Sequence, residues 1–196
     1  MYARVGKRVM DFGISLAAIL LLSPVFLVLT ALGAFFMKGN PFFTQARPGR
    51  HEKIFRLIKF RTMTNARGAD GELLPDAERL NGYGRFLRAS SLDELPELFN
   101  ILAGQMALVG PRPALWNQFD LIAERDRYGA NGVRPGLTGW AQINGRDELP
   151  IPEKARRDGY YANHISFGLD VKLIVRTFFS VIRFEGVVEG SKEDRK

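Results

Sequence analysis

The sequence predicts an α+β fold that is mostly helical and begins with a helical hairpin inserted in a membrane. Three observations lead to this fold class. Residues 12–36 are almost wholly apolar, a length sufficient for a membrane segment. Residues 41–63 form two runs with aromatic and aliphatic side chains on either side of a Pro-Gly pair, which is typical of a β-hairpin. Apolar positions in residues 88–102 and 167–185 recur at helical spacing.

Composition limits the classes of function. The chain has 196 residues, which corresponds to one domain in addition to the apolar N-terminus. It contains no Cys and only two His, which excludes disulfides and thiolate chemistry and argues against a zinc site. The net charge of +7 indicates anionic partners, namely phosphates or an acidic membrane surface. We expect no nucleic acid partner, because the sequence has no basic tail or aromatic–basic RNA motif.

The N-terminal apolar segment has Ser15, Ser23 and Thr30 as its only polar side chains. A straight transmembrane helix is one interpretation of this segment. Pro24 argues against it, because proline removes a backbone hydrogen bond and crowds the carbonyl of Leu20. Ser23 can satisfy the backbone groups that are freed there. We therefore expect a helix that is broken at Ser23-Pro24.

The charges that flank this segment indicate its topology. Basic residues lie on both sides of it: Arg4, Lys7 and Arg8 before, and Lys38, Arg47, Arg50 and Lys53 after. Because basic flanks prefer the cytoplasmic side, both ends are expected there. The segment then forms a re-entrant hairpin, each half about 18 Å long at ~1.5 Å per residue. Lys7 and Arg8 are expected at the interface, where they can meet lipid phosphates and where Asp11 can pair with one of them.

The middle of the chain begins with the predicted β-hairpin. Pro48-Gly49 is expected to form a type II turn. On the strand that follows, two sets of side chains alternate between the faces: Ile54, Arg56, Ile58 and Phe60 on one, and Phe55, Leu57, Lys59 and Arg61 on the other. Lys59 on this strand is either a solvated edge residue or a ligand for an anion. A polar loop is expected at residues 65–75. Asp76 is then expected to cap a short helix that covers residues 76–88.

The central stretch of the sequence carries two adjacent acids. Ser90 or Ser91 is predicted to be the N-cap of a helix, with Asp93 and Glu94 in its first turn. Adjacent residues point about 100° apart around a helix, so these carboxylates cannot share one proton as a facing pair would. They can instead divide two tasks, such as nucleophile and metal ligand or base. Ordinary capping is the alternative interpretation.

Two later segments present polar groups in rigid or turn-rich backbone. Arg112 lies between two prolines, which would hold its guanidinium with little loss of freedom on binding. Residues 133–146 are rich in glycine and contain Trp140, Gln142 and Arg146. They predict either a cradle for a base or sugar or a well-packed strand with turns. Neither segment matches a Walker loop or a dinucleotide-binding loop.

The C-terminal part of the chain is predicted to be an amphipathic helix. Residues 167–185 are rich in Phe, Ile, Leu and Val, with Lys172, Arg176 and Arg183 on the other side. A basic amphipathic helix fits a membrane surface, although a core helix would show a similar pattern. Residues 191–196 are expected to be a disordered tail.

Together these motifs resemble the small monotopic phosphoglycosyl transferases of the bacterial sugar transferase family. The resemblance covers nearly the whole chain, and the order and spacing of its motifs make it specific. The matching motifs are Lys7-Arg8-x-x-Asp11, Ser23-Pro24, Phe43-Thr44-Gln45, Lys59-Phe60-Arg61-Thr62-Met63, Ser91-Leu92-Asp93-Glu94-Leu95-Pro96, Gly110-Pro111-Arg112-Pro113 and Arg134-Pro135-Gly136-Leu137-Thr138-Gly139-Trp140-Ala141-Gln142.

The resemblance implies a reaction and roles for residues. Family members transfer a sugar 1-phosphate from a UDP-sugar to undecaprenyl phosphate and release UMP. Asp93 would be the nucleophile that carries a covalent phosphosugar, and Glu94 a metal ligand or a base. Mg2+ is expected at Asp93 and Glu94. The residues expected to bind phosphate or the nucleotide sugar are Lys59, Arg88, Arg112, Trp140, Gln142 and Arg146.

The resemblance also implies an organisation of the whole chain. Residues 1–38 would form the re-entrant membrane helix, and residues 39–190 a compact helical catalytic domain with interfacial amphipathic helices. The expected location is the cytoplasmic face of the bacterial inner membrane, and a homodimer is possible. The alternative is a catalytically silent membrane-anchored scaffold in a glycan-assembly complex. The sugar and the glycan pathway are open.

Overall fold

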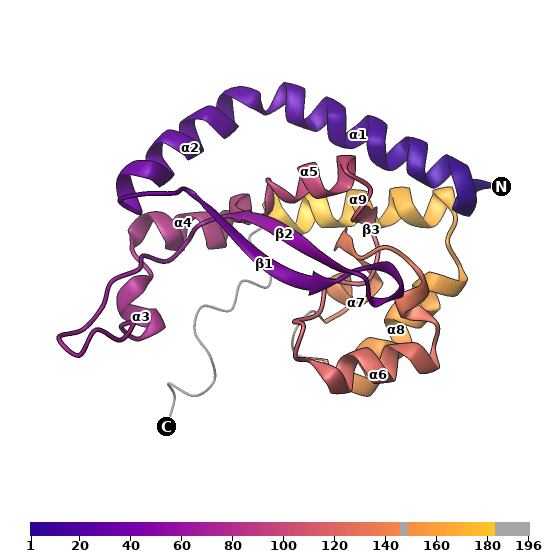
Figure 1. Ribbon diagram of the computed structural model, residues 1–196. Coiled ribbons are helices and arrows are strands. Elements are labelled where there is room, and N and C mark those ends of the chain that lie inside the picture. Colours follow the sequence, from indigo (N-terminus) through magenta and orange to yellow (C-terminus); the bar gives the residue numbers. More distant parts are fainter. Residues whose placement is uncertain (146–148, 183–196) are drawn as a thin grey trace.

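A computed structural model describes residues 1–145 and 149–182 of the chain (Figure 1). Its class is α+β with mostly helical elements, as predicted. The larger helices are α1 (Lys7–Leu21), α2 (Ser23–Phe36), α4 (Gly82–Ser90), α5 (Glu97–Leu102), α6 (Phe119–Arg127), α8 (Ile151–Asn163) and α9 (Phe167–Ile182). The short ones are η1 (Tyr2–Gly6), η2 (Arg50–Glu52), α3 (Asp76–Arg79), η3 (Leu92–Glu94), η4 (Ala130–Gly132) and α7 (Trp140–Ile143). The strands are β1 (Phe42–Pro48), β2 (Ile54–Phe60), β3 (Ala107–Val109) and β4 (Gly136–Thr138).

The N-terminal apolar segment is broken where the sequence predicts a break. Helices α1 and α2 meet at Leu22, and the segments Tyr2–Leu21 and Ser23–Phe36 are bent by 65°. The Ser23 hydroxyl donates to the Leu20 carbonyl over 2.8 Å, which satisfies a backbone acceptor that Pro24 leaves without a donor. Among the described helices, none alone has the length and apolar composition of a membrane span, but this bent pair has them jointly.

The predicted β-hairpin is present, with a different connection. Strands β1 and β2 are antiparallel, and Phe42 faces Phe60 in their register. The connection contains the single 3₁₀ turn η2, in which His51 has a left-handed backbone (φ 53°), so the expected two-residue type II turn is absent. Arg50 fixes this longer connection, because its Nε–H donates to the Gly132 carbonyl over 2.9 Å.

A second, parallel pair of strands organises the two turn-rich segments. β3 pairs with β4, with Val109 opposite Thr138. A Cβ on Gly136 would lie only 2.1 Å from the Gly110 backbone nitrogen, so the close approach of these segments requires glycine. Gly136 and Gly139 therefore serve the packing of this segment against Gly110, two residues before Arg112.

The helical predictions for residues 76–102 need two corrections. The expected helix from Asp76 is two helices, α3 and α4, and the second is capped by Asn81, which accepts from the Gly84 N–H over 2.9 Å. Ser91 does precede the acids as the N-cap residue of η3, but its side chain makes no capping hydrogen bond, and its left-handed backbone (φ 56°) also ends α4. The two acids lie on the separate 3₁₀ turn η3 and not in the first turn of α5. A serine hydroxyl can donate to a carbonyl of the preceding turn instead of capping the next one, as Ser90 does to the Phe86 carbonyl.

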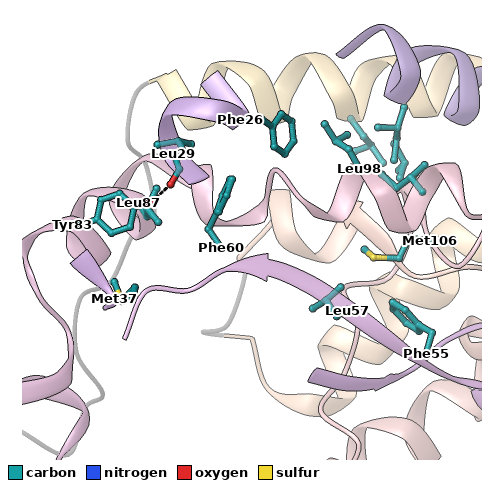
Figure 2. Close-up of a cluster of buried hydrophobic side chains, with 14 of the residues drawn as sticks. Phe26, Leu29, Met37, Phe55, Leu57, Phe60, Tyr83, Leu87, Leu98 and Met106 are labelled. Carbon is teal, nitrogen blue, oxygen red and sulfur yellow. Dashed lines mark hydrogen bonds between the residues drawn. The ribbon is translucent and has the colours of Figure 1, made fainter. Parts of the chain in front are cut away.

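The hydrophobic core joins α2 to the hairpin and the central helices (Figure 2). Phe26 of α2 lies 6.0 Å from Phe60 of β2, measured between ring centroids. The Tyr83 hydroxyl of α4 donates to the Leu29 carbonyl of α2 over 2.8 Å. Leu87 and Leu98 complete the contact from α4 and α5. The apolar N-terminal segment is thus partly built into the folded domain.

Helix α1 is attached to the domain through its charged first turns. The Lys7 ammonium lies 3.0 Å from the Asp170 carboxylate of α9 and 3.4 Å from Asp11. The Arg8 guanidinium donates to the carbonyls of Ile101 and Leu102 at the end of α5. The expected pairing of Asp11 is therefore present. Lys7 is buried and Arg8 half-buried, so both side chains point into the protein instead of towards lipid phosphates.

Candidate active site

Asp93 and Glu94 lie on η3, in the short connection between α4 and α5. The left-handed Ser91 reverses the chain after α4, and Pro96 is buried at the start of α5. Both acids are half-buried. The turn therefore presents two neighbouring carboxylates from a backbone that packing holds on both sides.

Glu94 is held by two cations that come from different parts of the chain. Its Oε1 accepts from the Lys59 ammonium over 2.7 Å and from the Arg112 guanidinium over 2.9 Å. Lys59 lies near the end of β2, and Arg112 follows β3. Burial would raise the pKa of Glu94, but Arg112 and Lys59 outweigh it and lower the pKa to about 2. Glu94 is therefore an anion that fixes two cations beside Asp93.

Asp93 has different surroundings. Across the described part of the chain, no hydrogen bond or ion pair involves its carboxylate. Burial and the neighbouring Glu94 raise its pKa to about 6, against the attraction of Lys59, Arg112 and Arg88. Asp93 therefore lies close to three cations without being paired to one, which leaves its oxygens available to react.

Glu97 is a member of the site that the sequence analysis did not single out. Its carboxylate lies 3.1 Å from the Lys59 ammonium, and the residue is only 3% exposed. Burial and the charge of Glu94 raise the pKa of Glu97 to about 7. Its position three residues after Glu94, on the same face of a helix, is the sequence signal that could have found it.

Asn100 is a second residue that the sequence analysis left without a role. It is 1% exposed, and its Oδ1 accepts from the Ile58 N–H of β2 over 3.0 Å. Its Nδ2 donates to the Arg56 carbonyl over 2.8 Å and to Gln105 over 2.7 Å. Asn100 thus binds two backbone groups of β2 and holds that strand, and with it Lys59, against α5.

Comparison with known proteins gives the family. The model of the bacterial sugar transferases matches residues 2–184. The chain belongs to the bacterial sugar transferase family. The sugar transferase EpsL of Bacillus subtilis is 43% identical, over 92% of this chain and 89% of the relative. The UDP-glucose:undecaprenyl-phosphate glucose-1-phosphate transferase of Klebsiella pneumoniae is 36% identical, over 89% of this chain.

The relatives differ in how much of their own length this chain covers. The chain spans 40% of the Klebsiella enzyme. It spans 43% of the UDP-N-acetylgalactosamine-undecaprenyl-phosphate N-acetylgalactosaminephosphotransferase of Aeromonas hydrophila, which is 34% identical over 90% of this chain. This sugar transferase thus matches less than half the length of these two enzymes, and nearly the whole length of EpsL.

Of the other predicted binding residues of this sugar transferase, Arg88 acts on the acids, whereas Trp140 and Gln142 have their contacts elsewhere in the fold. Arg88 donates from Nε to the Thr62 hydroxyl over 3.1 Å, and its charge acts on Asp93. Trp140 packs against Tyr160 of α8, with ring centroids 5.3 Å apart. Gln142 donates to the Leu137 carbonyl over 3.0 Å. Arg146 lies outside the described residues, as does the predicted tail.

The donor set suits Mg2+ only in part. Among the described residues there is no group of three acidic, His or Cys side chains arranged to hold a metal ion. Both cations bind Oε1 of Glu94, which leaves its other oxygen and the carboxylate of Asp93 as oxygen ligands. Mg2+ in phosphoryl-transfer sites commonly uses one or two carboxylates together with substrate phosphates and water. Asp93 and Glu94 therefore fit a site that the phosphates of a substrate would complete.

Proposed function

We propose that this sugar transferase moves a sugar 1-phosphate from a UDP-sugar to undecaprenyl phosphate, releases UMP and thereby initiates the assembly of a bacterial glycoconjugate. The names of the relatives from Klebsiella and Aeromonas support this reaction. The observation that carries it is the unequal pairing of two adjacent acids. Glu94 is bound to Lys59 and Arg112, whereas among the described residues no hydrogen bond or ion pair reaches the carboxylate of Asp93 beside the same cations.

The reaction has two steps at one phosphorus atom. A carboxylate oxygen of Asp93 attacks the β-phosphorus of the UDP-sugar, and the bond from that phosphorus to the bridging oxygen breaks. UMP leaves with the electron pair, and the sugar phosphate remains bound to Asp93 as an acyl phosphate. A phosphate oxygen of undecaprenyl phosphate then attacks the same phosphorus, and the bond to Asp93 breaks. This restores the carboxylate and yields the undecaprenyl diphosphosugar.

The neighbouring residues stabilise charge on the phosphates. Lys59, Arg112 and Arg88 supply positive charge around Asp93, where the equatorial phosphate oxygens of each step would lie. Mg2+, when bound, would neutralise charge on the donor diphosphate. The low pKa of Glu94 makes it a poor proton acceptor. This favours its role as a metal ligand and holder of cations over its role as the base.

A membrane location follows from the lipid acceptor. The bent α1–α2 pair exposes large apolar side chains along both helices, including Val9, Leu20, Leu27 and Phe35. A re-entrant insertion of this pair, with α9 as an amphipathic helix at the surface, would hold Asp93 at the level of the lipid phosphates. We place the protein on the cytoplasmic face of the bacterial inner membrane.

Intact-protein mass spectrometry tests the mechanism. The purified chain is incubated with UDP-glucose, UDP-galactose, UDP-N-acetylgalactosamine and further UDP-sugars in turn, with Mg2+ and without lipid acceptor. A mass increase of one sugar phosphate with one donor is expected, and it should be absent in Asp93→Asn. Asp76→Asn, which changes an exposed acid in the same way, should still form the adduct.

Two outcomes would contradict the proposal. UMP release that requires undecaprenyl phosphate and proceeds without any adduct would indicate direct transfer between the two substrates. Neither adduct nor UMP with the full range of donors, in the presence of the lipid acceptor, would favour the silent scaffold.

A further inference from the structure

Helix α9 presents an apolar face to the outside of the domain. Its opposite face is buried, with Asp170 and Leu173 fully covered. The outward positions recur every three or four residues, as one face of a helix does: Phe167, Val171, Val175 and Phe178 are all exposed, Phe167 by 59% and Phe178 by 62%. A continuous exposed apolar face of this kind usually marks an interaction surface.

The two long edges of this apolar face have different neighbours. On one edge, Phe167 contacts Tyr2 next to α1, with ring centroids 5.9 Å apart, so the face continues towards the apolar N-terminal helix. On the other edge, Lys172 and Arg176 are exposed one turn apart. The ammonium of Lys172 lies 5.9 Å from the ring centroid of Trp140.

Trp140 belongs to a strip of three aromatic rings that pack against one another. Its ring lies 5.3 Å from that of Tyr160, and the Tyr160 ring lies 4.3 Å from that of His164, with 20° between the last two planes. Tyr160 and His164 are exposed. We call these three residues the aromatic strip. It runs from α7 over α8, beside the cationic edge of α9.

We infer that the aromatic strip, together with Lys172 and Arg176, is a binding surface for the headgroup layer of an anionic phospholipid membrane. Trp and Tyr rings are enriched at membrane interfaces because one end is apolar and the other polar. Lys and Arg beside them bind anionic headgroups. The apolar face of α9 would enter the acyl-chain boundary, and the strip would fix the depth at which it stops.

A membrane is favoured over a soluble ligand because the aromatic strip adjoins the exposed apolar face of α9. The apolar face of α9 connects it to α1, and Lys7 of α1 is bound to Asp170 of α9. The strip thus lies on the outer edge of a surface that begins with the proposed membrane helix. The inference rests on the membrane location in the proposed function, but not on the covalent step.

The two tryptophans of the chain, Trp116 and Trp140, allow a matched measurement. Trp116→Phe leaves Trp140 as the single fluorophore, and Trp140→Phe leaves Trp116. Trp116 precedes α6, which lies at the end of the domain farthest from α1 (Figure 1). Each full-length variant is reconstituted into phosphatidylglycerol–phosphatidylcholine vesicles with bromine on the acyl chains, either near the headgroup or near the methyl end.

We expect Trp140 emission to be lost mainly with bromine near the headgroup, and Trp116 emission to change with neither lipid. Lowering the phosphatidylglycerol fraction should weaken the loss. Lys172→Glu should weaken it as well, whereas Arg127→Glu, the same charge change at an exposed residue of α6, should not. If Lys172→Glu fails to fold, the dependence on phosphatidylglycerol still tests the charge.

Equal quenching of Trp140 and Trp116 would overturn the inference. A Trp140 signal that responds to UDP-sugar in detergent, without quenching by brominated lipids, would also overturn it and place the strip on the donor side. The adduct with Asp93 is measured in detergent without vesicles. Failure of the membrane surface and failure of the proposed reaction are therefore separate results.

Discussion

Asp93 and Glu94 are neighbours in the chain with opposite electrostatic surroundings. Glu94 forms ion pairs with two cations and keeps its charge. Among the described residues Asp93 forms no ion pair, and burial raises its pKa to about 6. A carboxylate nucleophile reacts only when it is deprotonated. The difference between the two residues therefore leads to a prediction about pH.

Transfer of the sugar phosphate from the UDP-sugar to Asp93, with release of UMP, should decrease on the acid side with a midpoint near pH 6. Arg88→Gln removes one of the charges that lower the pKa of Asp93, so this midpoint should move to higher pH and loading at pH 6 should fall several-fold. The measurement is the initial rate of adduct formation by mass spectrometry across pH. The control is Arg85→Gln, because Arg85 is an exposed residue one turn earlier on α4. An acid midpoint unchanged by Arg88→Gln would contradict the prediction.

Glu97 leads to a prediction about stability. Its carboxyl keeps a proton up to a pH of about 7 in the folded protein, against 4.5 for an ordinary Glu. The folded state then binds more protons than the unfolded state between these values, so this group destabilises the fold as pH rises. Glu97→Gln removes that loss. Between pH 5 and pH 8, the free energy of unfolding of this variant should increase by about 1–3 kcal/mol relative to that of the parent chain, because one pKa unit corresponds to about 1.4 kcal/mol.

Thermal unfolding in detergent without Mg2+ measures this difference. The exposed acid Glu72 provides the control, since Glu72→Gln should shift the unfolding midpoint equally at both pH values. A Glu97→Gln variant that is less stable than the parent chain at pH 8 would show that the ion pair with Lys59 dominates over the cost of burial.

At the scale of elements, Asn100 joins α5 to β2. Asn100→Ala would leave the Ile58 N–H and the Arg56 carbonyl without their partner, at about 1–3 kcal/mol for each buried group left unpaired. We expect a lower unfolding temperature and slower loading of Asp93, because Lys59 follows Ile58 on the strand. Gln105→Ala removes only the third hydrogen bond and should leave loading close to normal. Normal loading by Asn100→Ala would refute the positioning role.

The same elements show what the sequence could predict. The β-hairpin and the helical break were predictable because alternation, proline and serine act locally, and the Ser23–Leu20 hydrogen bond is a contact within one turn. The serine cap was predicted correctly in position but not in its hydrogen bond: Ser91 precedes η3 without a side-chain cap, and the Ser90 hydroxyl donates to the preceding turn instead. The pairing of Glu94 with Arg112 depends on β3 and β4 meeting through Gly110 and Gly136, a contact that no local pattern encodes.

At the scale of the whole molecule, the N-terminal helices belong to the domain and to its proposed membrane anchor at once. The start of α1 is bound to α5 and α9 by Arg8 and Lys7. The far end of α2 returns to the domain, where the Asn81 amide donates to the Phe36 carbonyl over 3.3 Å. Because both ends contact the same domain, they must lie on the same side of any membrane that the bend enters.

This geometry predicts the labelling pattern of single cysteines, which can be introduced cleanly because the chain has none. Ala3→Cys and Lys38→Cys replace exposed residues at the two ends of the bent pair. Both should react with a membrane-impermeant maleimide in inverted inner-membrane vesicles and neither in intact spheroplasts. Arg127→Cys on α6 is the reference for the cytoplasmic side. Labelling of Ala3→Cys from the opposite side would show a straight spanning helix, which would require the contacts of Arg8 and Lys7 with the domain to break in the membrane.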